Sequence, residues 1–236
     1  MTIAYSNELH DRSRERGYTS ARVIAPFVYD LIKPASVVDV GCGHGYWLKT
    51  FELLGAGQVL GIDGEYIDRK KLEIPEDRFM SMDLNDPKPV GFRVDLAISI
   101  EVAEHLTPQA AAPFVSFLCR LSPCVLFSAA IPGQPGHCHI NPQWPAYWAE
   151  LFKAQGYVAL DCIRPRVWHE DSLMLCHRQN MLLYVHESLA GNKVFGSLPR
   201  MNCLTLIDHD VLQQLLCTRA SLQRMWGRLR NAMTGS

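Results

Sequence analysis

One stretch of the sequence decides the fold: Val37-Val38-Asp39-Val40-Gly41-Cys42-Gly43-His44-Gly45. Its first four residues are typical of a buried strand, and three glycines follow at alternate positions. Apolar residues compatible with a helix come next: Tyr46, Trp47, Leu48, Phe51, Leu53 and Leu54. Glycine has no Cβ and tolerates positive φ, so a turn built on glycines brings bare backbone against a ligand. The stretch therefore predicts a strand, a tight turn and a helix that together bind a nucleotide-like molecule.

Strand-like and helix-like segments alternate along most of the chain. This pattern predicts an α/β fold: a Rossmann-like, doubly wound, mostly parallel seven-stranded sheet with helices on both faces. The expected strands are 36–40, 58–62, 79–82, 94–99, 124–130, 157–162 and 180–185, and the expected helices are 20–31, 46–54, 108–121 and 143–155. We divide the chain into an N-terminal helical segment (1–35), a core domain (36–190) and a C-terminal extension that we expect to be helical (191–236).

Composition narrows the possible partners and the compartment. The 23 basic and 24 acidic residues give a net charge of −1, so nothing indicates binding to nucleic acid. No apolar run approaches the ~20 residues of a membrane span. The eight cysteines include no C-x-x-C pair, and no secretory signal begins the sequence, so we expect reduced thiols in a cytoplasmic protein. The sequence leaves the oligomeric state open, a homodimer included.

The glycine spacing distinguishes between ligands. The pattern is G-x-G-x-G with Asp39 two residues before Gly41, whereas dinucleotide sites carry G-x-G-x-x-G and P-loops carry Gly-Lys-Ser/Thr. In this feature the chain resembles the class I S-adenosylmethionine (SAM)-dependent methyltransferases. A pyrophosphate favours the free N–H groups of a helix N-terminus, whereas a sulfonium, an amino acid and a ribose favour carboxylates and carbonyls. A glycine turn without any ligand is the alternative.

Two acids after the glycine turn match the same family in the same order. Asp63 ends the second expected strand before Gly64, where an acid can accept hydrogen bonds from both hydroxyls of a ribose. Asp83 and Leu84 close the third expected strand. The resemblance implies that Asp83 binds the adenine amino group and that Leu84 packs on the ring. Turn-capping roles for both acids are the alternative.

The fourth expected strand runs into Ser99-Ile100-Glu101-Val102-Ala103-Glu104-His105. This segment resembles the E-V-x-E-H stretch of the family, which implies that Ser99 and Ile100 face the methionine end of SAM. It also implies that His105 lies close to the transferred methyl group.

The resemblance covers about residues 18 to 186 and extends to small bacterial methyltransferases of glycan and natural-product pathways, on the stretches Ile131-Pro132-Gly133, His-x-Asn and Gln-Trp-Pro-x-Tyr-Trp. It implies SAM as cofactor, S-adenosylhomocysteine as product, and an N-terminal segment that folds over the cofactor as a lid. The cofactor-binding residues that we assign are Tyr18, Asp39, Gly41, Cys42, Gly43, Asp63, Gly64, Asp83, Leu84, Ser99, Ile100 and Glu101.

The loop after the fifth expected strand is the expected place of the acceptor, because pockets of this fold lie beyond the carboxyl ends of the strands. A hydroxyl acceptor needs a base, and histidine suits that task near neutral pH. We assign His139 as general base or acceptor anchor, His105 as the second candidate and Asn141 as an orienting residue; structural roles are the alternative. His137 and His139 lie two residues apart and point to opposite sides of an extended loop, so we expect no metal site.

These patterns predict a SAM-dependent methyltransferase that acts on a small molecule, more readily on a hydroxyl of a sugar or natural product than on an amine. The alternatives are an N-methyltransferase acting on a small-molecule amine and a SAM-binding regulator or scaffold without turnover. An NAD-dependent reductase would need a different glycine register. The basic, amphipathic pattern near residues 212–230 favours a terminal helix with a solvated face over contact with a membrane or a partner.

Overall fold

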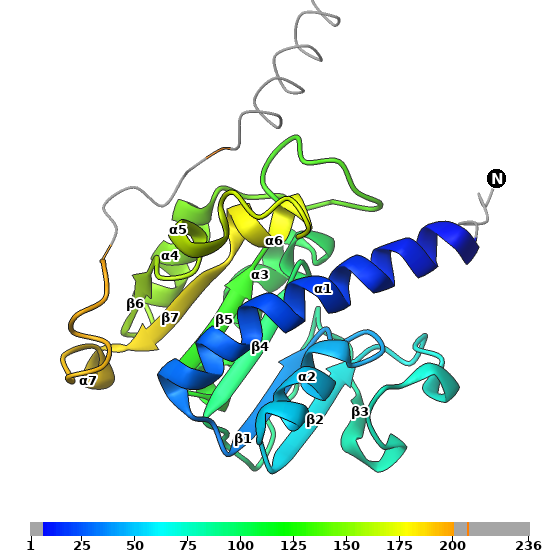
Figure 1. Ribbon diagram of the computed structural model, residues 1–236, viewed down its shortest axis with the longest axis horizontal. Helices are drawn as coiled ribbons and strands as arrows, with labels where there is room; N and C mark the ends of the chain where they lie inside the picture. Colours follow the sequence, from blue (N-terminus) through cyan, green and yellow to red (C-terminus); the bar gives the residue numbers. More distant parts are fainter. Residues whose placement is uncertain (1–6, 201–206, 208–236) are drawn as a thin grey trace, which may run out of the picture.

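The fold is seen in a computed structural model, which describes residues 7–200 and 207. Seven strands form one sheet in the order β3-β2-β1-β4-β5-β7-β6 (Figure 1). The strands are β1 (Ser36–Val40), β2 (Gln58–Asp63), β3 (Phe79–Ser81), β4 (Leu96–Ile100), β5 (Cys124–Ser128), β6 (Tyr157–Leu160) and β7 (Leu182–His186). All neighbouring strands are parallel except β7, which is antiparallel to β5 and β6. The predicted fold class is confirmed.

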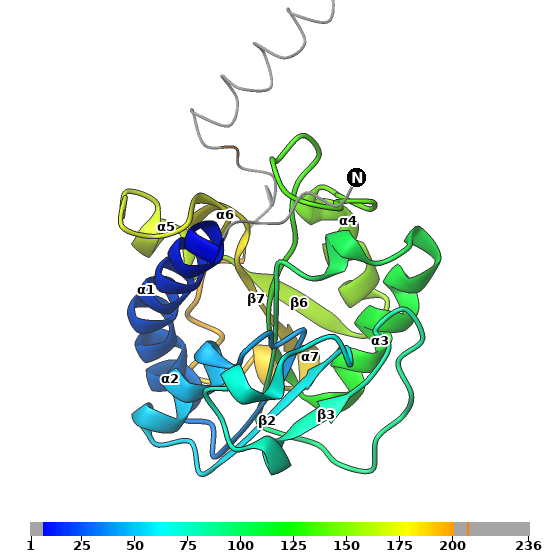
Figure 2. The ribbon, with the colours of Figure 1, turned by 90° about the vertical axis from the view of Figure 1, so that its right-hand side faces the viewer.

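Helices cover both faces of the sheet. Figure 2 shows α1 (Asn7–Ile32) and α2 (Tyr46–Leu54) on one side and α3 (Ala111–Leu121) and α4 (Pro145–Lys153) on the other. Successive residues of a strand point to opposite faces, so Val37 packs in the core beneath α1 and α2 and Val38 in the core beneath α3 and α4. The shorter helices are α5 (Arg164–Val167), α6 (Leu175–Asn180), α7 (Glu187–Ala190), η1 (Arg69–Lys71), η2 (Glu76–Arg78), η3 (Ala103–His105) and η4 (Pro108–Ala110). Nowhere in the described part of the chain is a helix long and apolar enough to cross a membrane.

The order of elements agrees with the prediction, and the differences lie at their ends. Helix α1 begins at Asn7 rather than near Ser20, because its first turns are polar and carry no apolar period. Helices α5 and α6 contain four and six residues, too few for a helical period to emerge from the sequence. The division of the chain at residues 35 and 190 stays a prediction, and the pattern at 212–230 lies outside the described residues.

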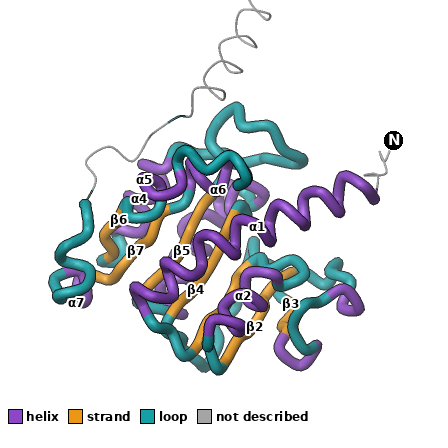
Figure 3. Tube along the Cα trace, in the orientation of Figure 1, coloured by secondary structure: helices purple, strands orange, loops and turns teal. Residues whose placement is uncertain are grey.

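The parallel strands all end at one edge of the sheet, and their following loops gather there. One of these loops, residues 129–144 between β5 and α4, is the teal loop at the top of Figure 3. In doubly wound sheets this edge is where ligands bind.

A buried ion pair fixes the end of β6 to α5. Asp161 follows β6 directly, and Arg164 is the first residue of α5. The Nε and Nη2 atoms of Arg164 donate hydrogen bonds of 2.9 and 2.7 Å to the two carboxylate oxygens of Asp161. Neither side chain is exposed to solvent. Such a two-pronged contact fixes the direction of both side chains.

We expect Arg164→Met to lower the free energy of unfolding by about 3–5 kcal/mol, because it leaves the Asp161 charge buried without its partner. The double variant Asp161→Leu/Arg164→Met removes both charges and should recover most of that loss. Urea unfolding of the two variants measures the difference. A double variant no more stable than the single one would show that packing, rather than the orphaned charge, dominates.

Candidate functional site

A cleft of about 1260 Å³ opens at the carboxyl ends of the parallel strands. Its walls come from the loops that follow β1, β2, β3, β4 and β5, so the sheet topology brings together residues far apart in the sequence. Eight of the residues assigned from the sequence line it: Gly41, Gly43, Asp63, Gly64, Asp83, Leu84, Glu101 and His105. Ligand pockets commonly measure about 300–1,000 Å³, so this cleft has room for more than one small molecule.

The other assigned residues are not part of the cleft lining. Tyr18 packs on Tyr46, with ring centroids 5.5 Å apart, and Arg22 lies over its face. Asp39 is buried within the sheet, where burial and then the charge of Asp63 raise its pKa well above the usual value. The remaining ones are Cys42 and Ser99, both buried, the half-buried Ile100 and the loop residues His139 and Asn141. Their assigned roles stay predictions.

Gly41 and Gly43 of the turn are glycines for different structural reasons. Gly41 has φ +84°, and a Cβ there would lie 2.3 Å from a methyl carbon of Val102, in the segment after β4. Gly43 has φ +53°, and a Cβ there would meet no atom within 4 Å. Packing therefore requires Gly41, whereas Gly43 leaves open space at the wall of the cleft.

Asp63 joins the end of β2 to the glycine turn. One carboxylate oxygen accepts the N–H of Gly43 at 2.7 Å, and the other accepts the N–H of Gly64 at 2.7 Å and the hydroxyl of Tyr66 at 2.6 Å. Desolvation of its hydroxyl group and then the bond to Asp63 raise the pKa of Tyr66 above its usual value, although most of the side chain is exposed. The hydroxyl group of the exposed Tyr66 thus donates to a carboxylate oxygen of Asp63 that we assigned to a ribose hydroxyl. Sequence reasoning missed Tyr66, since nothing distinguishes an aromatic residue in a polar loop.

Asp83 caps its own turn and also faces the cleft. Its Oδ1 accepts the N–H of Asn85 at 2.9 Å, and the Asn85 side chain in turn accepts the N–H of Thr107 at 2.9 Å. The loops after β3 and β4 are therefore tied together. Beside Asp83, the largely buried Leu84 supplies an apolar surface.

Glu101 is held in a backbone conformation that non-glycine residues rarely adopt. Its φ is +55°, and its N–H donates to the carbonyl and hydroxyl oxygens of Ser128 at 3.0 and 3.2 Å. Its carboxylate accepts hydrogen bonds from Gln134 at 2.8 Å and Asn180 at 3.3 Å, and Asn180 also donates to Gln134 at 2.8 Å. Such conformations persist where surrounding contacts enforce them, often at functional sites. Sequence reasoning missed Gln134 and Asn180, which lie on a loop and on α6.

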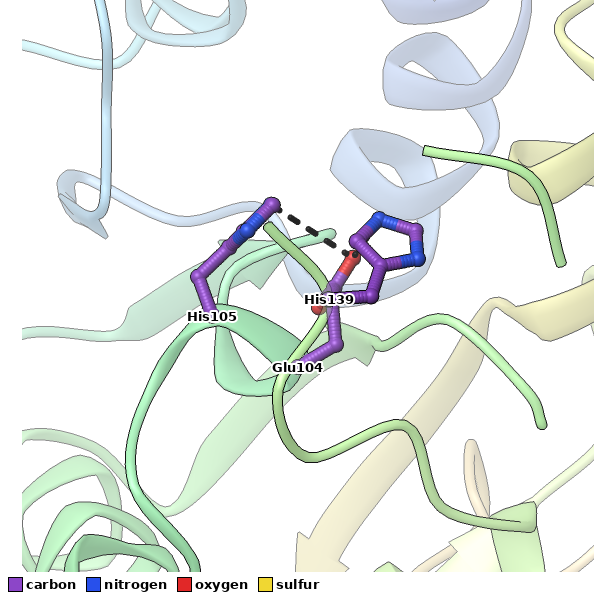
Figure 4. A group of neighbouring side chains, drawn as sticks. All are labelled: Glu104, His105 and His139. Carbon is purple, nitrogen blue, oxygen red and sulfur yellow. Dashed lines mark ion pairs between the residues drawn. The ribbon is translucent and has the colours of Figure 1, made fainter. Parts of the chain in front are cut away.

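Three side chains, which we call the Glu104 cluster, meet beside the cleft: Glu104, His105 and His139 (Figure 4). Glu104 and His105 belong to η3 after β4, and His139 comes from the loop after β5. The Nε2 atoms of His105 and His139 lie 4.0 and 3.9 Å from Oε1 of Glu104. The rings are in edge contact, with centroids 5.1 Å apart. The structure thus brings the two assigned histidines together around a carboxylate.

The electrostatics of the cluster differ strongly from those of free side chains. The Glu104 side chain is 1% exposed, and neither of its oxygens has a hydrogen-bond partner among the described residues. Burial and then the charge of Glu101 raise the pKa of Glu104 to about 9. Burial and then His105 lower the pKa of His139. The sequence contained Glu104 in the E-V-x-E-H stretch, but gave no sign that it lies between the histidines.

Asn141 positions the loop through its backbone. The N–H groups of Ile140 and Asn141 donate to the carbonyl oxygen of Glu104 at 3.0 and 2.9 Å. The buried Asn141 side chain accepts a hydrogen bond of 3.0 Å from Gln143. These bonds fasten the chain directly after His139 to η3.

Residues 11–120 match a family model described as a methyltransferase domain. This part of the chain, just under half of its 236 residues, is therefore similar to methyltransferase domains. This similarity implies SAM as cofactor, and the residues at the strand ends fit it: the open space at Gly43 admits a ligand against bare backbone, and Asp63 presents a carboxylate beside it. No curated protein sequence matches the chain.

Solved structures of methyltransferases share the fold of this domain. They include an O-methyltransferase family protein from Burkholderia thailandensis (14% identity, TM-score 0.50), Streptomyces venezuelae DesVI (16%, 0.54) and magnesium protoporphyrin IX methyltransferase from Synechocystis with bound SAM (19%, 0.54). The matches cover 78%, 79% and 79% of this chain, and 61%, 99% and 86% of the other chains. The chain therefore spans about 61% of the length of the Burkholderia protein.

The two glycines of the turn should respond differently to alanine. We expect Gly41→Ala to cost about 2–5 kcal/mol of unfolding free energy, since left-handed strain and the clash with Val102 add. Gly43→Ala should cost only the strain, about 1–2 kcal/mol, but should weaken SAM binding more than tenfold because its methyl group projects into the cleft. Thermal unfolding and calorimetric titration with SAM separate the two effects. Equal SAM affinity for Gly43→Ala and the unsubstituted domain would place the cofactor elsewhere.

Tyr66→Phe should tighten SAM binding by up to about tenfold, because it removes the hydroxyl group that competes with the ribose for Asp63. A hydrogen bond to a charged group contributes about 1.5–3 kcal/mol, and solvent screening reduces this value for the exposed Tyr66. Calorimetric titration measures the change. Tyr147→Phe, on an exposed tyrosine of α4, is the matched control and should have no effect. Weaker binding in Tyr66→Phe would mean that the hydroxyl contacts the cofactor instead of competing with it.

Proposed function

We propose that the domain transfers the methyl group of SAM to a hydroxyl group of a small molecule, such as a sugar or a natural product. One observation carries this proposal: the Glu104 cluster adjoins the same cleft as the glycine turn, and His105 belongs to both. Bound SAM supplies an electrophilic methyl group, and the cleft volume leaves space for an acceptor beside it. The cluster offers groups that can take up a proton at that place.

The cofactor half of the cleft follows from the strand ends. Asp63 would accept the ribose hydroxyls once Tyr66 moves away, and Asp83 with Leu84 would hold the adenine. The segment from Ser99 to Glu101 would face the methionine end. The roles proposed for Tyr18, Asp39 and Cys42 are to support the turn and the lid around these contacts.

The acceptor half rests on the two histidines. A hydroxyl is a poor nucleophile at neutral pH unless a base removes its proton, and a neutral imidazole can do so. The lowered pKa of His139 favours the neutral form, which supports His139 as the base. His105 faces the cleft and would contact the acceptor, while Asn141 holds the loop in place.

A hydroxyl acceptor is favoured over an amine because a hydroxyl must lose its proton to a base at the site, whereas an amine can lose its proton to water before it binds. The net charge of −1 supports a small molecule over a nucleic acid as acceptor. The six cysteines within the described residues are all free, which supports a reducing compartment such as the cytoplasm.

The test combines SAM binding with turnover. His139→Ala and His105→Ala should retain SAM affinity in calorimetric titration but form S-adenosylhomocysteine at least about 100-fold more slowly, the scale of general-base catalysis. The acceptors are a panel of small alcohols, sugars and amines. His169→Ala, on an exposed histidine between α5 and α6, serves as the control.

Two outcomes would contradict the proposal. SAM binding without turnover on any hydroxyl in the panel would favour a regulator or scaffold, and turnover restricted to amines would favour N-methylation. Absence of SAM binding would overturn the assignment of the cleft itself.

A further inference from the structure

We propose that the Glu104 cluster binds one divalent transition-metal ion, and that this ion orients the acceptor hydroxyl and promotes loss of its proton. The second clause rests on the proposed function, whereas the first does not. One ligand atom each from Glu104, His105 and His139 lies within 4.8 Å of the other two (Figure 4). This proposal departs from the sequence-based expectation of no metal site, which considered His139 only together with His137.

The carboxylate of Glu104 is the first argument for a cation. The side chain is 1% exposed, and no side chain in the part of the chain that the structure describes donates a hydrogen bond to either oxygen. Backbone N–H groups of Glu104 and Ala130 approach the carboxylate and oppose the effect of burial on its pKa. The Nε2 atoms of the two histidines, at 4.0 and 3.9 Å, lie beyond hydrogen-bonding distance. A buried polar group without a partner is costly and calls for an explanation such as an ion. A cation between the three atoms would bind the carboxylate and the Nε2 atoms of both imidazoles, whereas the buried Nδ1 of His139 would still have no partner among the described residues.

The tautomer of His105 is the second argument. Its Nδ1 lies 3.2 Å from the carbonyl oxygen of Cys138, and a carbonyl oxygen can only accept. Nδ1 therefore carries the proton, and in the neutral ring Nε2 directs its lone pair toward the carboxylate of Glu104. A cation between Nε2 and Oε1, which lie 4.0 Å apart, would bind the lone pairs of both atoms. A metal-bound histidine usually donates its other ring N–H to a carbonyl or carboxylate in this way.

The backbone holds the three ligands close to their places. Glu104 and His105 share η3 at the end of β4, and the Ile140 and Asn141 N–H groups fasten the segment after His139 to the Glu104 carbonyl. The chain at Gly136 lies against the His139 ring, since a Cβ there would fall 2.1 Å from the ring. Metal bonds of about 2.0–2.2 Å place two ligand atoms about 3–3.5 Å apart, so side-chain movements of about 1–1.5 Å close the site.

The ligand types select the class of metal. Two imidazoles and one carboxylate suit zinc, iron(II), cobalt(II) and manganese(II), whereas magnesium and calcium favour all-oxygen sites. Three protein ligands leave a coordination position open, as in catalytic metal sites. Because His105 lines the cleft, that position can face the acceptor.

The role of the ion follows from elementary acid–base chemistry. A divalent cation would lower the pKa of an oxygen that it binds, so the hydroxyl proton could leave to water. In the metal-bound site the ion would replace the role of base that we proposed above for His139. The oxygen then forms a bond to the methyl carbon, the carbon–sulfur bond of SAM breaks, and its electron pair remains on sulfur. The products are the methyl ether, S-adenosylhomocysteine and one proton. His105 and His139 then act as ligands.

The direct test is titration of chelator-treated full-length protein with Co²⁺ and Zn²⁺, followed by calorimetry and, for Co²⁺, by its visible spectrum. We expect one equivalent to bind with the spectrum of nitrogen and oxygen ligands. Glu104→Gln, His105→Asn and His139→Asn should each weaken Co²⁺ binding by more than about 100-fold. The reason is that each removes a ligand, whereas loss of a group that only hydrogen-bonds to a ligand costs about 10–100-fold. His137→Asn, Cys138→Ser and His169→Ala should bind Co²⁺ as the unsubstituted protein does.

The same samples keep the two proposals apart. Calorimetric titration with SAM reports the cofactor site independently, and thermal unfolding verifies that each variant is folded. Absence of Co²⁺ and Zn²⁺ binding in a protein that binds SAM would overturn the metal site and leave the proposed methyl transfer standing. Binding that depends on Cys138 or His137, or that survives Glu104→Gln, would also overturn it. Metal binding in a protein that fails to bind SAM would support the site but contradict the proposed function.

Discussion

The bonds from Asp63 to the glycine turn are the constraint on which the rest of the site depends. They join the carboxyl end of β2 to the turn after β1 at 2.7 Å, across two neighbouring strands of the parallel sheet. A carboxylate that accepts two backbone N–H groups fixes both chains at once and still faces the cleft. The register of β1 with β2, in which Asp39 stands opposite Gly61, brings those ends level. The cleft has its shape because both strands end at this carboxylate.

The other wall of the cleft depends on the segment after β4. Val102 lies so near Gly41 that a Cβ there would overlap it, and Glu101 beside it adopts a left-handed conformation enforced by Ser128, Gln134 and Asn180. The turn after β1 and the segment after β4 therefore determine each other's position. The position of η3, which follows this segment directly, is therefore fixed. Glu104 and His105 belong to η3 and are held in place with it.

The sequence predicted the parts of the molecule that repeat a local rule. Alternating strand and helix patterns predicted the sheet and the order of its elements. The glycine spacing with Asp63 and Asp83 predicted residues that line the cleft, and their role in cofactor binding stays a prediction. Contacts between distant segments had no local signal. Tyr66 reaches Asp63 from a polar loop, Asn180 reaches Glu101 from a six-residue helix, and His139 reaches Glu104 across 35 positions of sequence. These contacts form because the sheet topology brings the loops together. Residues far apart in the sequence leave no local pattern from which such a contact could be predicted.

The charge of the cleft gives an independent reason for the kind of molecule it accepts. Its lining contains Asp63, Glu65, Asp83 and Glu101, and among the described residues neither a lysine nor an arginine lines it. Fixed negative charge in a partly enclosed cleft raises the local concentration of cations and repels anions. A dinucleotide would bring a pyrophosphate to this surface with no cationic side chain in the lining to neutralise it. A sulfonium carries a positive charge, so the same carboxylates that attract it disfavour the NAD-dependent alternative.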